Sequence, residues 1–280
     1  MTEPAPVILI GAARSGTKIL RDLLAASSGV KAVPYDINYV WRYGAEGHDM
    51  LDPEALTWRR VRFIRETIPR LAGARPSDIV VEKTVSNTLR VPFVNRVFPA
   101  ARYVHLIRDG RDVAESAMRQ WQAPPDWRAL ARKLRGMPLA NAGYVAWFGG
   151  NMLRGAVAGR GGGGVWGPRY PGVEQAVAEG LATACARQWV ASVERARADL
   201  AALPGDRVFE IRYEDMVADP DRVGDLARAL DLPDPGAVAA AALARLRPTP
   251  PGAWRELPPT DRSVFDAILS PSLSRLGYAS

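Results

Sequence analysis

Four short apolar runs along the chain lack the alternation of polar and apolar residues that a half-exposed strand shows. They are Val7–Ile10, Ile79–Glu82, residues 103–107 and residues 208–213. A strand that reads as a continuous apolar run is typical of a parallel sheet covered on both faces. We therefore expect these runs to be buried strands of a central parallel sheet.

The stretches between these runs have helical spacing. Over residues 17–26, one helical face would carry Ile19, Leu20, Leu23 and Leu24. Further helices are expected over residues 54–71, 112–121, 176–202 and 261–269. Strands that alternate with helices predict an α/β fold with flanking helices around the sheet. We expect a single domain over residues 1–280.

Residues 122–172 depart from this rhythm and are rich in Trp, Tyr, Gly and Pro. We interpret them as an insertion rather than an interdomain linker, because large aromatic side chains need burial or a ligand. Its aromatic residues include Trp127, Tyr144, Trp147, Trp166 and Tyr170. They would form either a small satellite core or a pocket for an acceptor, and the sequence leaves both open.

Composition narrows the class of protein. The 280 residues are 48% hydrophobic and 24% charged, enough apolar material for a sizeable core. The one cysteine, Cys185, excludes an internal disulfide, and with two histidines a His/Cys metal site is not expected. No apolar run approaches the length of a membrane span, and the first residues lack a secretory layout. We expect a cytoplasmic protein that needs no metal.

The net charge of +7 favours anionic partners. Nucleic acid is one such partner, but the basic residues are spread along the chain and form no dense block or arm. A nucleic-acid-binding protein is therefore kept only as a minor alternative.

The loop Gly11-Ala-Ala-Arg-Ser-Gly-Thr17 carries the sharpest chemical signal. A glycine-rich turn between a strand and a helix presents backbone N–H groups and a helix N-terminus to an anion. Arg14 adds a guanidinium, and Ser15 and Thr17 add hydroxyl groups. An ordinary tight turn would need the glycines but not these side chains, so we predict a phosphate-binding loop.

The order Gly16-Thr17-Lys18 differs from that of a nucleotide-splitting loop. Such a loop needs Gly-Lys followed by Ser or Thr, where the lysine bridges phosphates and the hydroxyl holds magnesium. Lys18 stands one position late and no hydroxyl follows it. A P-loop kinase or ATPase remains the alternative enzyme class.

The segment Ala13-Arg-Ser-Gly-Thr17 after a strand resembles the 5′-phosphosulfate loop of sulfotransferases that use 3′-phosphoadenosine 5′-phosphosulfate (PAPS), especially the bacterial, tyrosylprotein and glycan branches. The resemblance implies a P-loop NTPase-like sulfotransferase fold. It places the 5′ end of the donor against Arg14, Ser15, Gly16, Thr17 and Lys18.

Three further segments resemble the same family and follow in its order. A strand ending in Arg108, with Ser116 eight residues later, is similar to the 3′-phosphate motif. Tyr213, in Arg-Tyr-Glu-Asp, matches a tyrosine that lies near the adenine. The tail from residue 252 to 257 resembles the closing segment, so the resemblance places Trp254 and Arg255 at the donor as well.

Glu82-Lys83-Thr84 looks like the family element that lines the sulfuryl group. The resemblance therefore gives Arg14 and Lys83 catalytic roles in neutralising charge on the leaving phosphate. Small-molecule sulfotransferases have a histidine base two residues after this lysine, where the present chain has Val85. A carboxylate would then act as the base, unless no protein base is used. Asp36 is the first candidate and Glu82 the second.

Several of these residues also have structural interpretations. Asp36 could cap the segment that follows it, and Asp109 could cap the helix after Arg108. His105, inside an apolar run, is expected to be a hydrogen-bonded structural residue.

The sequence thus predicts a PAPS-dependent sulfotransferase that acts on a hydroxyl or amine of a carbohydrate or small natural product. It specifies neither the acceptor nor an oligomeric state. No nucleic-acid partner and no membrane span are expected.

Overall fold

The computed structural model describes residues 4–45, 47–124, 165–247 and 252–278. The predicted insertion at 122–172 lies largely outside these residues, and so do Trp127, Tyr144 and Trp147. The single-domain organisation therefore stays a prediction.

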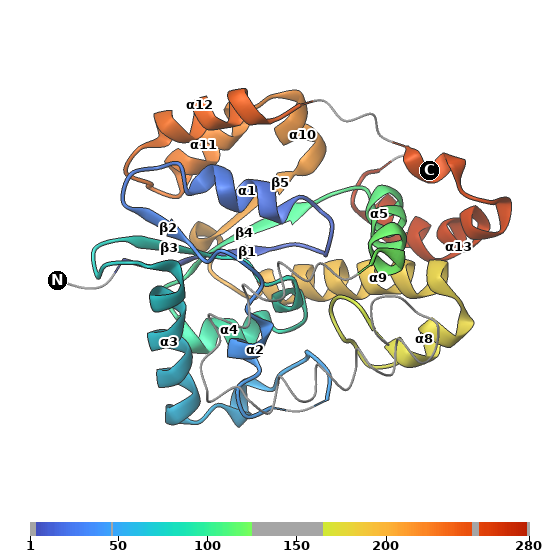
Figure 1. The fold of residues 1–280 in the computed structure, drawn as a ribbon, viewed down its shortest axis with the longest axis horizontal. Coiled ribbons are helices and arrows are strands. Elements are labelled where there is room, and N and C mark those ends of the chain that lie inside the picture. The colour runs from blue at the N-terminus through green and yellow to red at the C-terminus, as the bar shows by residue number, and fades with distance from the viewer. Residues whose placement is uncertain (1–3, 46, 125–164, 248–251, 279–280) are drawn as a thin grey trace.

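The centre of the molecule is a five-stranded parallel sheet (Figure 1). Its strands are β1 (Val7–Ile10), β2 (Val30–Ala32), β3 (Ile79–Glu82), β4 (Arg102–Ile107) and β5 (Val208–Arg212). Their order is β2-β3-β1-β4-β5, and every neighbouring pair is parallel. This confirms the predicted α/β class with a central parallel sheet.

Successive residues of β1 point to opposite faces of the sheet, and both faces are buried. Val7 and Leu9 belong to one apolar cluster, whereas Ile8 and Ile10 belong to another. The first cluster is closed by α1 (Thr17–Leu24), α10 (Tyr213–Ala218), α11 (Asp221–Ala229) and α12 (Pro235–Arg245). The second is closed by α2 (Asn38–Trp41), α3 (Trp58–Ala72), α4 (Val91–Val97) and α9 (Leu181–Leu200). Burial on both faces explains why β1 reads as a continuous apolar run.

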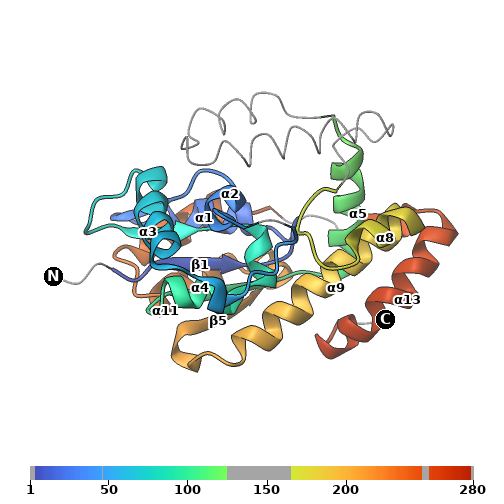
Figure 2. The ribbon, with the colours of Figure 1, turned by 90° about the horizontal axis from the view of Figure 1, so that it is seen from below.

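A third apolar cluster lies beyond the carboxyl ends of the strands. It joins α9 to α5 (Gly110–Gln122), α8 (Val173–Glu179) and α13 (Pro259–Arg275), which Figure 2 shows beside one another. Cys185 is buried here, and burial raises the pKa of its thiol to about 12. The thiol is therefore protonated at neutral pH and packs as a small apolar group.

Helix boundaries differ from the expected ones where side chains cap a helix or glycine interrupts it. The stretch 54–71 splits into a 3₁₀ turn, Pro53–Ala55, and α3, because the Thr57 hydroxyl accepts a hydrogen bond from the Arg60 N–H. The prediction of one helix over residues 176–202 was wrong, because Gly180, with φ of 136°, separates α8 from α9. The first and last helices also differ in length from the predicted ones: α1 ends at Leu24 instead of residue 26, and α13 extends to Arg275 instead of residue 269.

Several short elements were not predicted. They are β2, α2, α4, α10, α11, α12 and the 3₁₀ turns Val85–Leu89, Gly205–Arg207 and Ala253–Glu256. Within the described residues, no helix is both long and apolar enough to cross a membrane.

Close approach of α5 and α9 depends on Gly110. A β-carbon built at Gly110 would lie 2.8 Å from three ring atoms of Trp189, a buried residue of α9. Gly110→Ala should therefore lower the free energy of unfolding by about 1–3 kcal/mol, through overpacking. The measurement is urea denaturation. Gly205→Ala is the matched control, because nothing lies within 4 Å of a β-carbon there; equal stability of the two variants would contradict this packing.

Candidate active site

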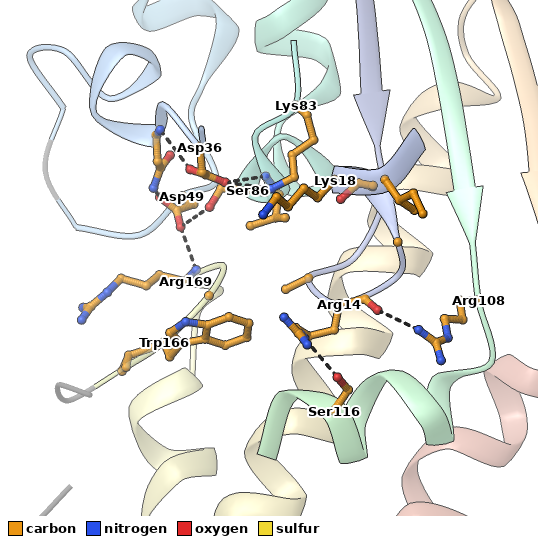
Figure 3. A pocket seen from close by; sticks show the side chains of 18 of the residues that line it. Arg14, Lys18, Asp36, Asp49, Lys83, Ser86, Arg108, Ser116, Trp166 and Arg169 are labelled. Atoms are coloured by element: carbon orange, nitrogen blue, oxygen red, sulfur yellow. Dashed lines mark hydrogen bonds and ion pairs between the residues drawn. The ribbon is translucent and has the colours of Figure 1, made fainter. Parts of the chain in front are cut away.

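A cavity of about 690 Å³ opens at the carboxyl ends of the strands. The loops after β1, β2, β3 and β4 and the start of α10 all contribute to its wall, together with the segment before α8 (Figure 3). Loops at the carboxyl edge of an open parallel sheet are where ligands bind in such folds. Predicted site residues in the wall are Arg14, Gly16, Thr17, Lys18, Asp36, Lys83, Arg108, Ser116 and Tyr213.

The loop between β1 and α1 is tightly wound beneath the cavity. Gly16 has φ of 99°, and a β-carbon there would come within 2.5 Å of the Tyr213 ring. The buried Ser15 hydroxyl donates a 2.7 Å hydrogen bond to the Ala12 carbonyl, so it shapes the loop and does not line the cavity. Only glycine fits at position 16, which brings the loop backbone against Tyr213.

Arg14 connects the first loop to the helix after β4. Its Nε donates a 3.0 Å hydrogen bond to the Ser116 hydroxyl, and its carbonyl accepts one of 3.3 Å from Arg108. The Arg108 guanidinium also lies 4.2 Å above the centre of the Tyr213 ring. The residues predicted for the two ends of the donor thus form one connected group.

Positive charge dominates this group. Burial, then the nearby Arg119 and Arg108, lower the pKa of Arg14, because a second guanidinium close by disfavours its charged form. Together, Arg14, Arg108, Lys18 and Lys83 give this part of the wall four cationic side chains. An anion placed among them would be stabilised.

Asp36 lies in the cavity wall next to Lys83. Its carboxylate accepts hydrogen bonds from the backbone N–H groups of Val85, at 3.0 Å, and Asn38, at 3.2 Å. The Lys83 Nζ is 3.8 Å away. Asp36 therefore binds the N–H of Asn38, the first residue of α2, although the N-cap residue of that helix is Ile37, and it also presents a carboxylate to the cavity.

Glu82, the second candidate base, lies below the cavity and not in its wall. It is fully buried, and it accepts hydrogen bonds from the Thr84 hydroxyl, at 2.5 Å, and from the Asn87 amide, at 2.8 Å. The Thr84 hydroxyl also accepts from the Ile37 N–H. Glu82 thereby ties the loop of Lys83 to the loop of Asp36, an orienting arrangement.

A buried carboxylate missed by the sequence analysis, Asp49, organises the far wall. It accepts hydrogen bonds from the Asn38 amide, the Ser86 hydroxyl and the Arg169 N–H, all within 2.9 Å. Arg42 and Arg90 lie within 3.9 Å of the same carboxylate. Asp49 stands in a stretch without periodicity, and its partners are up to 120 residues away, so no local signal marks it.

Two predicted donor residues lie away from the cavity. Trp254 and Arg255 belong to a short turn whose Gly252 N–H bonds to Asp112 at the start of α5. Arg111 stacks on the Trp254 ring at 4.8 Å. Neither Trp254 nor Arg255 is in the wall, so their donor contacts stay a prediction.

The two other residues given structural interpretations behave as expected. His105 is buried in β4, with its Nδ1 3.4 Å from the Glu210 carboxylate. The Asp109 side chain accepts the Arg111 N–H at the start of α5, so it caps that helix.

Burial raises the pKa of Glu82 to about 7, so this carboxyl holds its proton better in the fold than in the unfolded chain. The contribution of this carboxyl to the free energy of unfolding is full at a pH below the ordinary pKa of glutamate and is lost as the pH rises through about 7. Glu82→Gln should therefore flatten the decline in unfolding free energy between about pH 4.5 and 7, by up to about 3 kcal/mol. Urea denaturation across this range measures it, and parallel curves for the two proteins would contradict the assignment.

Comparison with known proteins identifies the family. The model described as "Sulfotransferase family" matches residues 57–148 and 168–235, more than half of the chain. The matched residues include Lys83, Arg108, Ser116 and Tyr213 but not the loop after β1. No curated protein matches the sequence.

Solved structures share the fold. A sulfotransferase of Mycobacterium avium, STF9, aligns over 100% of this chain and 78% of its own, with a TM-score of 0.57 and 13% identity. A sulfotransferase from Alicyclobacillus acidocaldarius aligns over 98% of this chain and 94% of its own, with a TM-score of 0.51 and 18% identity. Mouse SULT7A1, complexed with PAP, aligns over 96% of this chain and 85% of its own, with a TM-score of 0.50 and 13% identity. These likenesses confirm the predicted P-loop-like sulfotransferase fold, and with the family match they lead to one conclusion: the chain belongs to the sulfotransferase family.

Proposed function

We propose that this sulfotransferase moves the sulfuryl group of PAPS to a hydroxyl, or an amine, of a carbohydrate or small natural product. The observation that carries the proposal is the meeting of Arg14, Lys83, Arg108 and Ser116 with the Asp36 carboxylate around one cavity. A volume of about 690 Å³ suits a nucleotide with a small acceptor beside it. The reaction is proposed to take place in the cytoplasm.

The donor would lie along the loops after β1 and β4. Its 5′ phosphosulfate would meet the N–H groups of the Gly16 turn, Thr17, Lys18 and the start of α1, where the helix end favours negative charge. Its 3′ phosphate would meet Arg108 and Ser116. The Ser116 hydroxyl accepts from Arg14, so its own proton remains for a phosphate oxygen. The structure of mouse SULT7A1, which was solved in complex with PAP, supports a donor of this class.

Sulfuryl transfer asks the protein to align two oxygens and to neutralise the one that leaves. The acceptor oxygen forms a bond to sulfur while the bond from sulfur to the phosphate oxygen breaks, which releases adenosine 3′,5′-bisphosphate. Arg14 and Lys83 would stabilise the charge that grows on the leaving oxygen. The acceptor's proton would pass to Asp36, which faces the cavity beside Lys83.

Glu82 would act through its neighbours. Its hydrogen bond to Thr84 fixes the segment between Lys83 and Val85, whose N–H holds Asp36. Glu82 has no face in the cavity wall, so we assign it a positioning role and assign proton transfer to Asp36.

Donor recognition is the first test. Adenosine 3′,5′-bisphosphate should bind at least about tenfold more tightly than AMP, because charged hydrogen bonds contribute roughly 1.5–3 kcal/mol each. Calorimetry measures both affinities. Ser116→Ala should narrow the difference, whereas Ser263→Ala, an exposed residue of α13, should leave it unchanged. Equal affinities of the wild-type protein for the two nucleotides would remove the 3′-phosphate assignment.

Asp36→Asn tests the proposed base. The variant should keep its affinity for adenosine 3′,5′-bisphosphate and lose at least about a hundredfold in turnover, within the range for general bases. Release of the bisphosphate from PAPS, with a mixed panel of sugars and phenols as acceptors, gives the rate. Glu82→Gln is the matched comparison and should retain far more activity. Wild-type turnover in a folded Asp36→Asn protein would exclude Asp36 as the base.

A further inference from the structure

The segment just before α8 forms one end of the cavity and places an aromatic ring in it. Val165, Trp166, Gly167 and Arg169 all line the wall. Figure 3 shows the Trp166 indole pointing into the cavity, across an open space from Lys83 and Lys18. None of these residues has a part in the donor site described above.

Two buried side chains from distant parts of the chain hold this segment by its backbone. The Gln188 amide of α9 donates to the carbonyls of Trp166, at 2.8 Å, and Pro168, at 3.0 Å. On the other side, Asp49 accepts the Arg169 N–H, and its own N–H bonds to the Arg169 carbonyl, both at 2.8 Å. Four backbone groups within four residues are therefore fixed by side chains or backbone outside the segment.

Gly167 shows how closely the backbone of this segment packs against the Gln188 side chain. Its φ is 82°, and a β-carbon there would lie 2.8 Å from the Gln188 Oε1. The Trp166 ring itself contacts Trp121 of α5, with ring centres 6.5 Å apart. Backbone and ring are both held, so Trp166 presents a preorganised aromatic surface, a property that reduces the entropic cost of binding.

One side of this ring packs against the third apolar cluster, whereas the cavity wall opposite it is polar. Besides Val85 and Val165, the cavity wall near it carries Asp36, Asn38, Ser86 and Arg169. A flat aromatic ligand would leave these groups against an apolar surface, which is unfavourable. A pyranose ring has an apolar face of C–H groups and a rim of hydroxyls, so it matches one aromatic surface surrounded by polar side chains.

Arg42 and Arg169, the arginines in the wall at this end, each have a carboxylate within 4 Å, and Arg42 shares its carboxylate, Asp49, with the buried Arg90. Arg42 lies 3.7 Å from Asp49, and Arg169 lies 3.5 Å from Glu174. The four cations described above belong to the donor half. The acceptor end therefore suits an uncharged ligand better than an acidic one.

We propose that Trp166 is the stacking surface for an uncharged sugar ring of the acceptor, and thus a specificity-determining residue. This inference rests on the proposed sulfuryl transfer and names its acceptor class. A ring on Trp166 would direct hydroxyl groups across the cavity toward Asp36 and Lys83.

The experiment is a glycan microarray probed with the labelled full-length protein in the presence of adenosine 3′,5′-bisphosphate. The wild-type protein should bind neutral glycans. Trp166→Ala should weaken that binding about tenfold or more, and Trp166→Phe should restore part of it, as expected for an aromatic contact. Trp58→Ala, which removes a tryptophan 67% exposed on α3, is the matched control and should bind like wild type.

Kinetics with the best array ligand give a second readout. Trp166→Ala should raise KM and leave kcat nearly unchanged, because stacking stabilises ground state and transition state alike. A merely structural role would instead lower kcat and the affinity for the bisphosphate, and Phe would not rescue it. The bisphosphate affinity of all three variants should equal that of wild type.

Three results would overturn the inference. They are binding to no neutral glycan, equal glycan binding by Trp166→Ala, and sulfation of 2-naphthol with no sulfation of sugars. Each leaves the proposed function intact as long as the bisphosphate still binds tightly. Loss of bisphosphate binding in the wild-type protein would instead remove the proposed function itself.

Discussion

Parallel pairing of β1 between β3 and β4 is the constraint on which the proposed donor half of the cavity depends. Parallel neighbours end at the same edge of the sheet, so the loops after these three strands must meet there. Arg14, Lys83 and Arg108 follow their strands by one to four residues, so this pairing brings them to the same edge of the sheet, around one cavity. Because β1 is apolar on both faces, a slip of one residue would only exchange one apolar set for another, so an alternation of polar and apolar residues does not specify its register.

Residues close to strand ends could be predicted from the sequence, because their positions follow from local pattern and topology. The four longer strands belong to this class, and so does the place of Arg14 in the loop after the first of them, whereas Lys83 and Asp36 were expected at the site only from the family resemblance. Asp49 and Gln188 could not be predicted, since a buried polar contact between remote segments leaves no periodicity. The three-residue strand β2 was missed for a related reason: its residues are too few to show a pattern, and pairing with β3 defines it.

Under the cavity, buried polar side chains are linked by hydrogen bonds into a single layer. Glu82 binds Thr84 and Asn87, the Arg90 guanidinium binds Asn87 and Asn38, and Asn38 binds Asp49. Burial lowers the pKa of Arg90 to about 10, which still leaves it charged at neutral pH. Its positive charge offsets the nearby carboxylates, and unpaired buried charges would be costly. The layer therefore holds the loops of Lys83 and Asp36 in place; of its charged groups, Asp49 lines the cavity, whereas Glu82 and Arg90 do not.

The proposed donor and acceptor halves of the cavity are built by different means, and this has a functional consequence. The donor half consists of strand ends and a helix N-terminus, so the fold itself determines its geometry. The acceptor half consists of a segment held by two side chains, Asp49 and Gln188, that lie outside the sheet. A substitution in that segment can alter the surface offered to an acceptor while the sheet edge keeps its shape. Under the proposed function, the acceptor specificity of this protein can therefore vary independently of donor recognition, and Trp166 lies at the position proposed to control it.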